Sequence, residues 1–323
     1  MQLLEKGKIE SVSHDGITWV DVQNPTRTEA DILAREYHFH PLNLADCIAE
    51  SHLSKIDPHD EYVFLLIHLP VYRSEKDQIA SSQASVFLGK NYVVSLHDNQ
   101  CKPLRDLFQR AKLDETFRQT YMAKSSAHLL YQILYRLVDE TFPMLDTVMR
   151  KLDEVEDWVF DERVTVIREV SVLRRDIADL RRIIFPLRRL IGELQAKAQR
   201  YSVQDISAYF GDVKDHIEMA WENLEEAKET VEIYKDTDYI LSSERANTIL
   251  AVLTILFTLT IPPTVIGTLY GMNIPLPGGS ETGPWTLPFG TYTTFIIMLL
   301  ASLIPSSVMV WYFRRLGWFW RRS

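Results

Sequence analysis

Residues 246–273 read ANTILAVLTILFTLTIPPTVIGTLYGMN, and this stretch decides how the chain is organised. Between Arg245 and Arg314 the only charged residue is Glu281, although 24% of the whole chain is charged. A soluble domain rarely lacks charges over such a length, whereas membrane-spanning helices do, because a charge at the centre of a bilayer is costly. The pattern predicts two transmembrane helices, over 248–270 and 290–313, joined by an extracytoplasmic loop over 271–289.

The basic residues around this stretch predict its topology. Arg245 precedes the first span, and the loop from 273 to 289 contains no Lys or Arg. Positive residues stay on the cytoplasmic side of a membrane. We therefore expect a multi-pass protein of the cell's inner (plasma) membrane with both termini in the cytoplasm. The C-terminus is a basic tail over 314–323, with Arg314, Arg315, Arg321 and Arg322.

The rest of the chain has the composition of a soluble protein. The net charge of −9 argues against nucleic acid as a partner. Two cysteines, Cys47 and Cys101, are too few for a disulfide framework or a metal site of cysteine pairs. The start, Met1–Lys6, lacks the apolar segment of a secretory signal, which predicts a reducing, cytosolic N-terminal part. The nine histidines are scattered without metalloprotease spacing, so we expect no enzyme.

Short apolar runs separated by turns occupy residues 1–125 and predict a cytoplasmic α/β domain. A hairpin-like turn at Gly89-Lys90-Asn91 joins the last two strands. The predicted strands are 16–22, 62–69, 84–89 and 92–96, and the predicted helices are 28–37 and 41–49.

Helical periodicity replaces this pattern in residues 126–202, which we expect to form a cytoplasmic helical hairpin region. Residues 126–158 read as one amphipathic stretch with a kink at Pro143. Pro186 should kink or end the helix that follows, because proline cannot donate the backbone hydrogen bond that a helix interior requires.

A stalk helix is predicted over 203–247. No obvious stop signal precedes Asn247, so the helix should continue into the first span and reach about 100 Å at ~1.5 Å per residue. Its apolar residues follow one another at steps of three and four, which is the spacing of a heptad seam. They are Val203, Ile206, Phe210, Val213, Ile217, Ala220, Leu224, Ala227, Val231 and Tyr234.

Opposite charges distinguish the stalk from the segment before it. Residues 203–245 contain twelve acidic and four basic residues, a net charge of −8, whereas residues 164–200 contain four acidic and nine basic residues, a net charge of +5. These segments can pack as an antiparallel hairpin with opposite charges facing. The alternative is that each segment has an independently solvated charged face.

A polar stripe follows one face of the first span. Two spans cannot enclose a hydrophilic path, so a transporter of this design must assemble around an axis. Amide and hydroxyl groups can hydrogen-bond a hydrated ion, and bulky apolar groups can form constrictions. The alternative is that the threonines bond backbone carbonyls in a packed bundle. The stripe contains Asn247, Leu250, Thr254, Phe257, Ile261, Thr264 and Thr268.

Two further features bear on the membrane part. Pro262-Pro263 frees backbone groups inside the membrane, which is tolerated where they face protein or a water-filled cavity. The second span is almost entirely apolar and is broken by Pro305, so we expect it to form an outer, lipid-facing ring. Its serines Ser302, Ser306 and Ser307 would allow close contact between helices.

The sequence Tyr270-Gly271-Met272-Asn273 ends the first span and resembles the signature of the CorA family of divalent-cation channels. The resemblance covers nearly the whole chain. It includes His40-Pro41-Leu42 followed by Asp46, Phe185-Pro186-Leu187-Arg188, and the stalk segment Asp212-Val213-Lys214-Asp215-His216.

This resemblance implies a homopentamer whose α/β domains form a cytoplasmic funnel. The channel would conduct Mg²⁺, and also Co²⁺ or Ni²⁺, down the electrochemical gradient, with Mg²⁺ also as the regulatory ion. Tyr270, Gly271, Met272 and Asn273 would form the selectivity filter. Asn247 would line the inner mouth, and Leu250 and Ile261 would line a hydrophobic gate. Asp212 and Asp215 would help bind the regulatory ion, with Glu75 or Asp77 of a neighbouring subunit as partner.

The loop after Asn273 departs from the family pattern. Its only acid is Glu281, and its glycines resemble the zinc-transporting ZntB branch, whereas Met272 favours the Mg²⁺ branch. Two alternatives stay open: a Zn²⁺ transporter of the ZntB branch and a membrane-anchored oligomeric scaffold.

Overall fold

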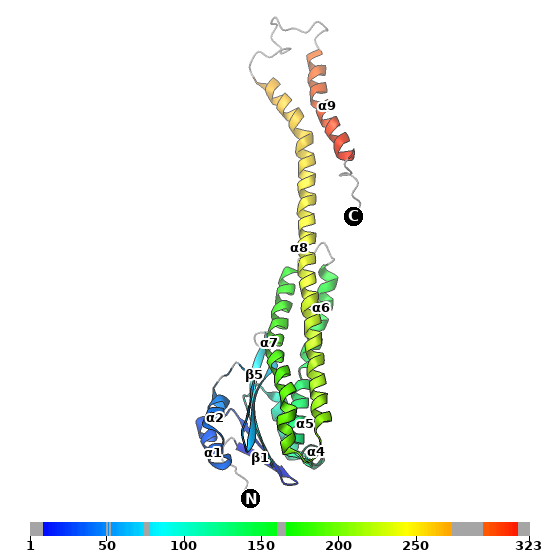
Figure 1. Ribbon diagram of the computed structural model, residues 1–323. Coiled ribbons are helices and arrows are strands. Elements are labelled where there is room, and N and C mark those ends of the chain that lie inside the picture. The colour runs from blue at the N-terminus through cyan, green and yellow to red at the C-terminus, as the bar shows by residue number, and fades with distance from the viewer. Residues whose placement is uncertain are drawn as a thin grey trace. The chain divides into compact units, whose positions relative to one another are not determined.

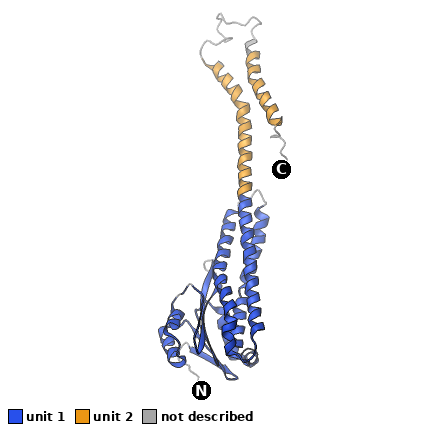
Figure 2. Cartoon of the chain, viewed as in Figure 1, with its two compact units in different colours: residues 1–238 blue, residues 239–323 orange. Residues whose placement is uncertain are grey.

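The computed structural model describes residues 9–49, 51, 53–73, 78–159, 166–272 and 293–315. The chain divides into two compact units, residues 1–238 and residues 239–323 (Figure 2). The division falls inside α8, a helix that runs from Ser207 to Gly271. The first unit holds a sheet and most of the helices, and the second holds the apolar end of α8 and the helix α9 (Thr293–Arg315).

One six-stranded sheet, in the order β1-β2-β6-β5-β4-β3, organises the first unit. Neighbouring strands are antiparallel except β2 and β6, which are parallel. Gly89 and Tyr92 end and begin the strands of the expected β5–β6 hairpin. The strands are β1 (Ile9–His14), β2 (Ile17–Gln23), β3 (Lys55–Pro58), β4 (Tyr62–Arg73), β5 (Gln78–Gly89) and β6 (Tyr92–His97).

Both faces of this sheet are buried, because side chains alternate between two hydrophobic cores. In β4, Val63 and Leu65 belong to the larger core, whereas Phe64 and Leu66 belong to the smaller one. The short helices α1 (Arg27–Tyr37) and α2 (Pro41–Ile48) cover the face of the smaller core, and the long helices cover the other (Figure 1).

Helix starts in this unit follow local capping rules. Asp114 accepts a hydrogen bond from Phe117 N at the start of α4 (Glu115–Met122), and Ser125 accepts one from His128 N at the start of α5 (Ser126–Asp139). The helix α3 (Lys102–Leu113) precedes them. The helices α3 and α4 and the edge strands β1 and β3 are not among the elements predicted from the sequence.

Two predictions about proline need correction. The stretch 126–158 is two helices, because α5 ends at Asp139 and α6 (Phe142–Val159) begins one residue before Pro143. Proline is well tolerated in the first turn of a helix, where its missing N–H would have no partner. Of the two effects predicted for Pro186, a kink or an end of the helix, the end is wrong, because α7 (Ile167–Ala198) continues for another twelve residues.

The predicted seam of the stalk is buried from Ile206 to Tyr234, so this prediction is confirmed. Phe210, Val213 and Leu224 are each at most 1% exposed. Val203 is the exception. It precedes α8, which starts only at Ser207 after the short turn η1 (Gln199–Tyr201), and its side chain is fully exposed.

Ion pairs confirm the antiparallel packing of α7 against α8. Arg181 lies 2.7 Å from Glu225, and Arg188 lies 2.6 Å from Glu218. Seven residues forward along α7 therefore correspond to seven residues backward along α8. Trp221 lies between the two pairs, with the guanidinium of Arg181 4.9 Å and that of Arg188 5.7 Å from its ring.

A buried polar group lies within the sheet. The carboxylate of Asp21 accepts a hydrogen bond of 2.5 Å from Ser95 Oγ and lies 3.2 Å from Nε2 of His97. Burial lowers the pKa of His97, but the hydrogen bond and charge of Asp21 outweigh it, so that the pKa lies above the usual 6.5.

Candidate ion path and regulatory site

The second unit contains two helices long and apolar enough to cross a membrane. The apolar window of α8 has a mean hydropathy of 2.2, and that of α9 has 2.0. Almost none of these windows is buried within the single chain, since 0% of the first and 6% of the second is covered. Such apolar surfaces are stable only where lipid or further protein covers them.

The predicted polar stripe lies along one face of α8 and is exposed in the single chain. Leu250, Phe257 and Ile261 are each more than half exposed, and Asn247 is exposed as well. The stripe is therefore free to face other copies of the chain or an aqueous path.

The threonines of the stripe bond their own helix. Thr254 Oγ1 donates to Leu250 O over 2.7 Å, Thr264 Oγ1 to Thr260 O over 2.7 Å, and Thr268 Oγ1 to Thr264 O over 2.8 Å. This is the alternative role that the sequence left open. It does not remove the first role, because a hydroxyl that donates its proton still has lone pairs that accept hydrogen bonds from water.

The C-terminal end of α8 carries the motif that resembles a selectivity filter. Gly271 is the last residue of α8, and Met272, whose amide donates to Leu269 O over 3.3 Å, is half exposed. Added bulk at Gly271 would meet no atom within 4 Å in the single chain. Tyr270 belongs to α8, and Asn273 lies outside the described residues.

A hydrogen bond joins the two apolar helices at the proline pair. Pro262 and Pro263 lie inside α8, and Oγ of Ser306 on α9 lies 3.3 Å from the carbonyl oxygen of Leu259. Ser306 is 9% exposed. The expectation that a serine of the second span allows close contact between helices is confirmed for this residue.

The basic residues after the second span are described in part. Arg314 and Arg315 form the last turn of α9, where positive side chains complement the helix dipole. The guanidinium of Arg315 lies 5.5 Å from the ring of Trp311, one of the aromatic residues near that end. Arg321 and Arg322 lie outside the described residues.

Asp212 of the candidate regulatory pair lies at the base of α8 beside two polar side chains. Its Oδ2 accepts a hydrogen bond of 3.3 Å from Tyr131 Oη, and its Oδ1 lies 3.6 Å from Nδ1 of His216. Burial and the neighbouring Asp212 charge raise the pKa of Tyr131 to about 12, so its hydroxyl remains a donor at neutral pH.

A metal site at this position needs further ligands. Asp215 is exposed, and among the described residues no three His, Cys, Asp or Glu side chains are close enough together to hold a metal ion. The predicted partners Glu75 and Asp77 lie outside the described residues, between Arg73 at the end of β4 and Gln78 at the start of β5.

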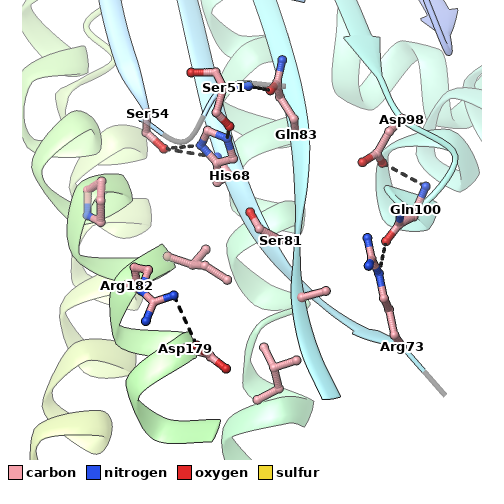
Figure 3. A pocket seen from close by; sticks show the side chains of 14 residues that line it. Ser51, Ser54, His68, Arg73, Ser81, Gln83, Asp98, Gln100, Asp179 and Arg182 are labelled. Carbon is pink, nitrogen blue, oxygen red and sulfur yellow. Dashed lines mark hydrogen bonds and ion pairs between the residues drawn. The ribbon is translucent and has the colours of Figure 1, made fainter. Parts of the chain in front are cut away.

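A cavity of about 540 Å³ lies beside β4, β5 and α7 in the first unit (Figure 3). Its charged side chains have partners at its rim, since Arg73 Nε donates to Gln100 Oε1 over 2.9 Å and Arg182 lies 3.5 Å from Asp179. Nε2 of His68 lies 2.7 Å from Ser51 O. This cavity could not be predicted from the sequence, because its lining comes from segments far apart in the chain.

Comparison with known proteins places the whole chain in one group. Residues 14–315 match a family model described as CorA-like Mg²⁺ transporter protein. A putative metal ion transporter of Bacillus subtilis, YfjQ, is 30% identical over 98% of this chain and 95% of its own length. The cobalt/magnesium transport protein CorA of Thermotoga maritima is 27% identical over 93% of this chain and 83% of its own.

Solved structures agree with this result at the level of the fold. The CorA magnesium transporter of Methanocaldococcus jannaschii has a TM-score of 0.75 over 95% of this chain and 93% of its own, at 18% identity. The cytoplasmic domain of ZntB from Vibrio parahaemolyticus has a TM-score of 0.52 over 71% of this chain and 86% of its own, at 15% identity. At such identities a likeness concerns the fold alone.

Proposed function

This chain belongs to the CorA-like Mg²⁺ transporter family, and we propose that it is a channel through which Mg²⁺ enters the cell down its electrochemical gradient. A membrane transporter of divalent cations, and not an enzyme, is what the family membership establishes. The proposal adds how the protein transports ions, which ions it carries, which residues take part and how many copies assemble.

The observation that carries the proposal is the character of α8 in the second unit. The stripe from Asn247 to Thr268 combines an amide and hydroxyls with bulky apolar side chains on an otherwise apolar helix that ends at Gly271. A simple membrane anchor does not need such a face. The scaffold alternative therefore accounts for less of the sequence than a channel does.

A ring of Asn273 side chains is the proposed selectivity filter, together with Tyr270, Gly271 and Met272. Amide oxygens are neutral, and Mg²⁺ gives up its water shell reluctantly, so an amide ring suits an ion that enters hydrated. Inside the membrane, the threonine oxygens that remain free to accept hydrogen bonds would support the same shell. Leu250, Phe257 and Ile261 would form the constrictions of the closed state.

The membrane potential supplies the driving force in this proposal. A divalent ion gains about 4.6 kcal/mol for each 100 mV of inside-negative potential, because each elementary charge gains about 2.3 kcal/mol. We place the chain in the inner (plasma) membrane with both termini in the cytoplasm, since Arg245, Arg314 and Arg315 flank the two apolar segments.

Gating by intracellular Mg²⁺ would use Asp212 of one subunit and Glu75 or Asp77 of the next. Asp212 is half exposed, and within the described parts of the chain its carboxylate has one long hydrogen bond, from Tyr131, and one long contact, to His216, so its oxygens are accessible to an ion. A divalent ion shared between two subunits would draw them together and so favour one arrangement of the ring. Five copies follow from the family resemblance.

The ions carried besides Mg²⁺ are proposed to include Co²⁺ and Ni²⁺. The Thermotoga maritima relative is named a cobalt/magnesium transport protein, which supports Co²⁺. Zn²⁺ transport of the ZntB kind is the second candidate, favoured by the glycine-rich loop with Glu281 as its single acid.

Uptake by proteoliposomes tests the proposal. The full-length protein, Asn273→Ala and the control Asn223→Ala, which alters an asparagine of the stalk, would be compared with Mg²⁺, Co²⁺, Ni²⁺ and Zn²⁺ outside. We expect Mg²⁺ uptake by the first and third proteins, and lost or unselective uptake by Asn273→Ala. Zn²⁺ uptake without Mg²⁺ uptake would favour the ZntB alternative, and no divalent uptake by folded protein would favour the scaffold.

A further inference from the structure

The proline pair in α8 leaves two backbone carbonyls, those of Thr258 and Leu259, without their usual donors. In an α-helix the N–H of each residue donates to the carbonyl four positions earlier, and proline has no N–H. Pro263 therefore cannot donate a hydrogen bond to the carbonyl of Leu259. In the hydrocarbon region a carbonyl without a partner is costly, because no water is present to replace the lost bond.

A side chain from the other apolar helix lies next to this carbonyl. Oγ of Ser306 is 3.3 Å from Leu259 O and 3.1 Å from Ser302 O of its own helix. Among the described residues of the second unit, Ser306 is the only polar residue that is buried. Ser302, one turn earlier, is less covered and donates to Leu299 O within α9 over 2.9 Å.

We propose that Ser306 is a positioning residue, whose hydroxyl donates to the Leu259 carbonyl that Pro263 leaves free and so ties α9 to the proline pair of α8. Leu259 lies two residues before Ile261, which is on the candidate pore stripe. The segment beyond the prolines ends in the candidate filter. A hydrogen bond at Leu259 therefore lies at a point of α8 where a change in the direction of the helix would move both the candidate pore stripe and the candidate filter.

The competing explanation is that the Ser306 hydroxyl only serves its own helix. A serine in a helix commonly donates to the carbonyl four residues earlier, and Ser302 O is within reach. The two explanations differ in their dependence on Pro263. If the hydroxyl bonds only within α9, its contribution does not depend on residue 263. If it bonds to Leu259 O, its contribution is lost once residue 263 has an N–H that can donate to the same carbonyl.

Thr and Val variants at position 306 provide a matched comparison, because the two side chains have nearly the same shape and only Thr has a hydroxyl. Ser306→Thr and Ser306→Val would be made in the otherwise natural chain and in Pro263→Ala, which restores the N–H. Ser302→Ala serves as the control, since its hydroxyl bonds only within α9 among the described residues. The readouts are Mg²⁺ flux in proteoliposomes and the unfolding temperature of the purified full-length protein.

With Pro263 present, we expect the flux of Ser306→Val to differ from that of Ser306→Thr by about threefold, which is the effect of an average interhelical hydrogen bond in a membrane protein on an equilibrium. The Val variant should also unfold at a lower temperature than the Thr variant. Both differences should disappear in Pro263→Ala, and Ser302→Ala should behave like the natural chain.

Differences of the same size in both backgrounds, or none in either, would overturn the inference. The flux readout rests on the proposed channel function, whereas the unfolding temperature does not. If the natural chain carried no Mg²⁺, the proposed function would fail, and the dependence of the unfolding temperature on Pro263 would still decide the role of Ser306.

Discussion

Charge reversal at Arg188 tests the packing of α7 against α8. In the natural chain its guanidinium lies 2.6 Å from Glu218 and 5.7 Å from the Trp221 ring. Both partners of the ion pair are about one third exposed, so the pair contributes about 0.2–1 kcal/mol. The contact with Trp221 contributes about 0.5–1 kcal/mol.

Arg188→Glu removes both contacts and places two carboxylates together, which adds a repulsion of roughly the same size as the lost pair. The total destabilisation is then about 1–3 kcal/mol. For a folding unit of this size, 1 kcal/mol lowers the unfolding temperature by about 2–4 °C. We therefore expect a decrease of several degrees for Arg188→Glu, measured by thermal unfolding of the full-length protein at low salt.

The decisive result is a recovery of the unfolding temperature in the double variant Arg188→Glu/Glu218→Arg, because the exchanged charges face each other again. The control is Arg189→Glu, which alters an exposed neighbour that forms no ion pair within the described parts of the chain. Equal effects of Arg188→Glu and Arg189→Glu, or no recovery in the double variant, would refute the paired arrangement and favour independently solvated helices.

Three further predictions concern the core, the sheet and the regulatory site. Leu224→Ala removes a fully buried seam residue and should cost about 2–5 kcal/mol, whereas Asn223→Ala beside it should change the unfolding temperature little. Because the pKa of His97 is raised above 6.5 beside Asp21, the stability from this pair is present below pH 6.5 and is lost as the pH rises through the raised pKa. The difference in unfolding temperature between the natural chain and Asp21→Asn should shrink in that direction, and a growing difference would contradict the assignment. Asp212→Asn should keep Mg²⁺ flux active at internal Mg²⁺ concentrations that silence the natural chain, as measured in vesicles loaded with increasing Mg²⁺; unchanged inhibition would exclude Asp212 as a ligand of the regulatory ion.

The features that depend on one continuous pattern could be predicted from the sequence. The seam from Ile206 to Tyr234 repeats every three or four residues, and each of its members is buried. The absence of charge between Arg245 and Glu281 likewise marked the apolar end of α8. Each of these signals is read along a single helix, so it does not require knowledge of the tertiary fold.

Features that depend on tertiary contacts were harder to predict from the sequence. The assignment of the edge strands β1 and β3 rests on their pairing with β2 and β4 rather than on their own composition. Pro143 was read as a kink in one helix, but it stands in the first turn of a second helix. The bond between Ser306 and Leu259 joins residues 47 positions apart, and only the fold brings them together.

The residues of the candidate site could be predicted from residue type and spacing. The way in which several copies of the chain complete the site could not. The stripe and the end of α8 lie on one chain, so their relation follows from helical spacing. Their roles in a filter, a gate or a shared metal site require further copies of the chain. The roles of Asn247, Asn273, Asp212 and Asp215 therefore stay predictions.

The most direct test of the central claim is the potential at which net Mg²⁺ flux through the reconstituted protein reverses. For a passive channel carrying a divalent ion, that potential should shift by about 30 mV for each tenfold change in the Mg²⁺ gradient, because two charges cross with each ion. We predict this shift, with influx that increases as the inside becomes more negative. Mg²⁺ flux that does not respond to the potential would contradict a channel and indicate a coupled, electroneutral transporter.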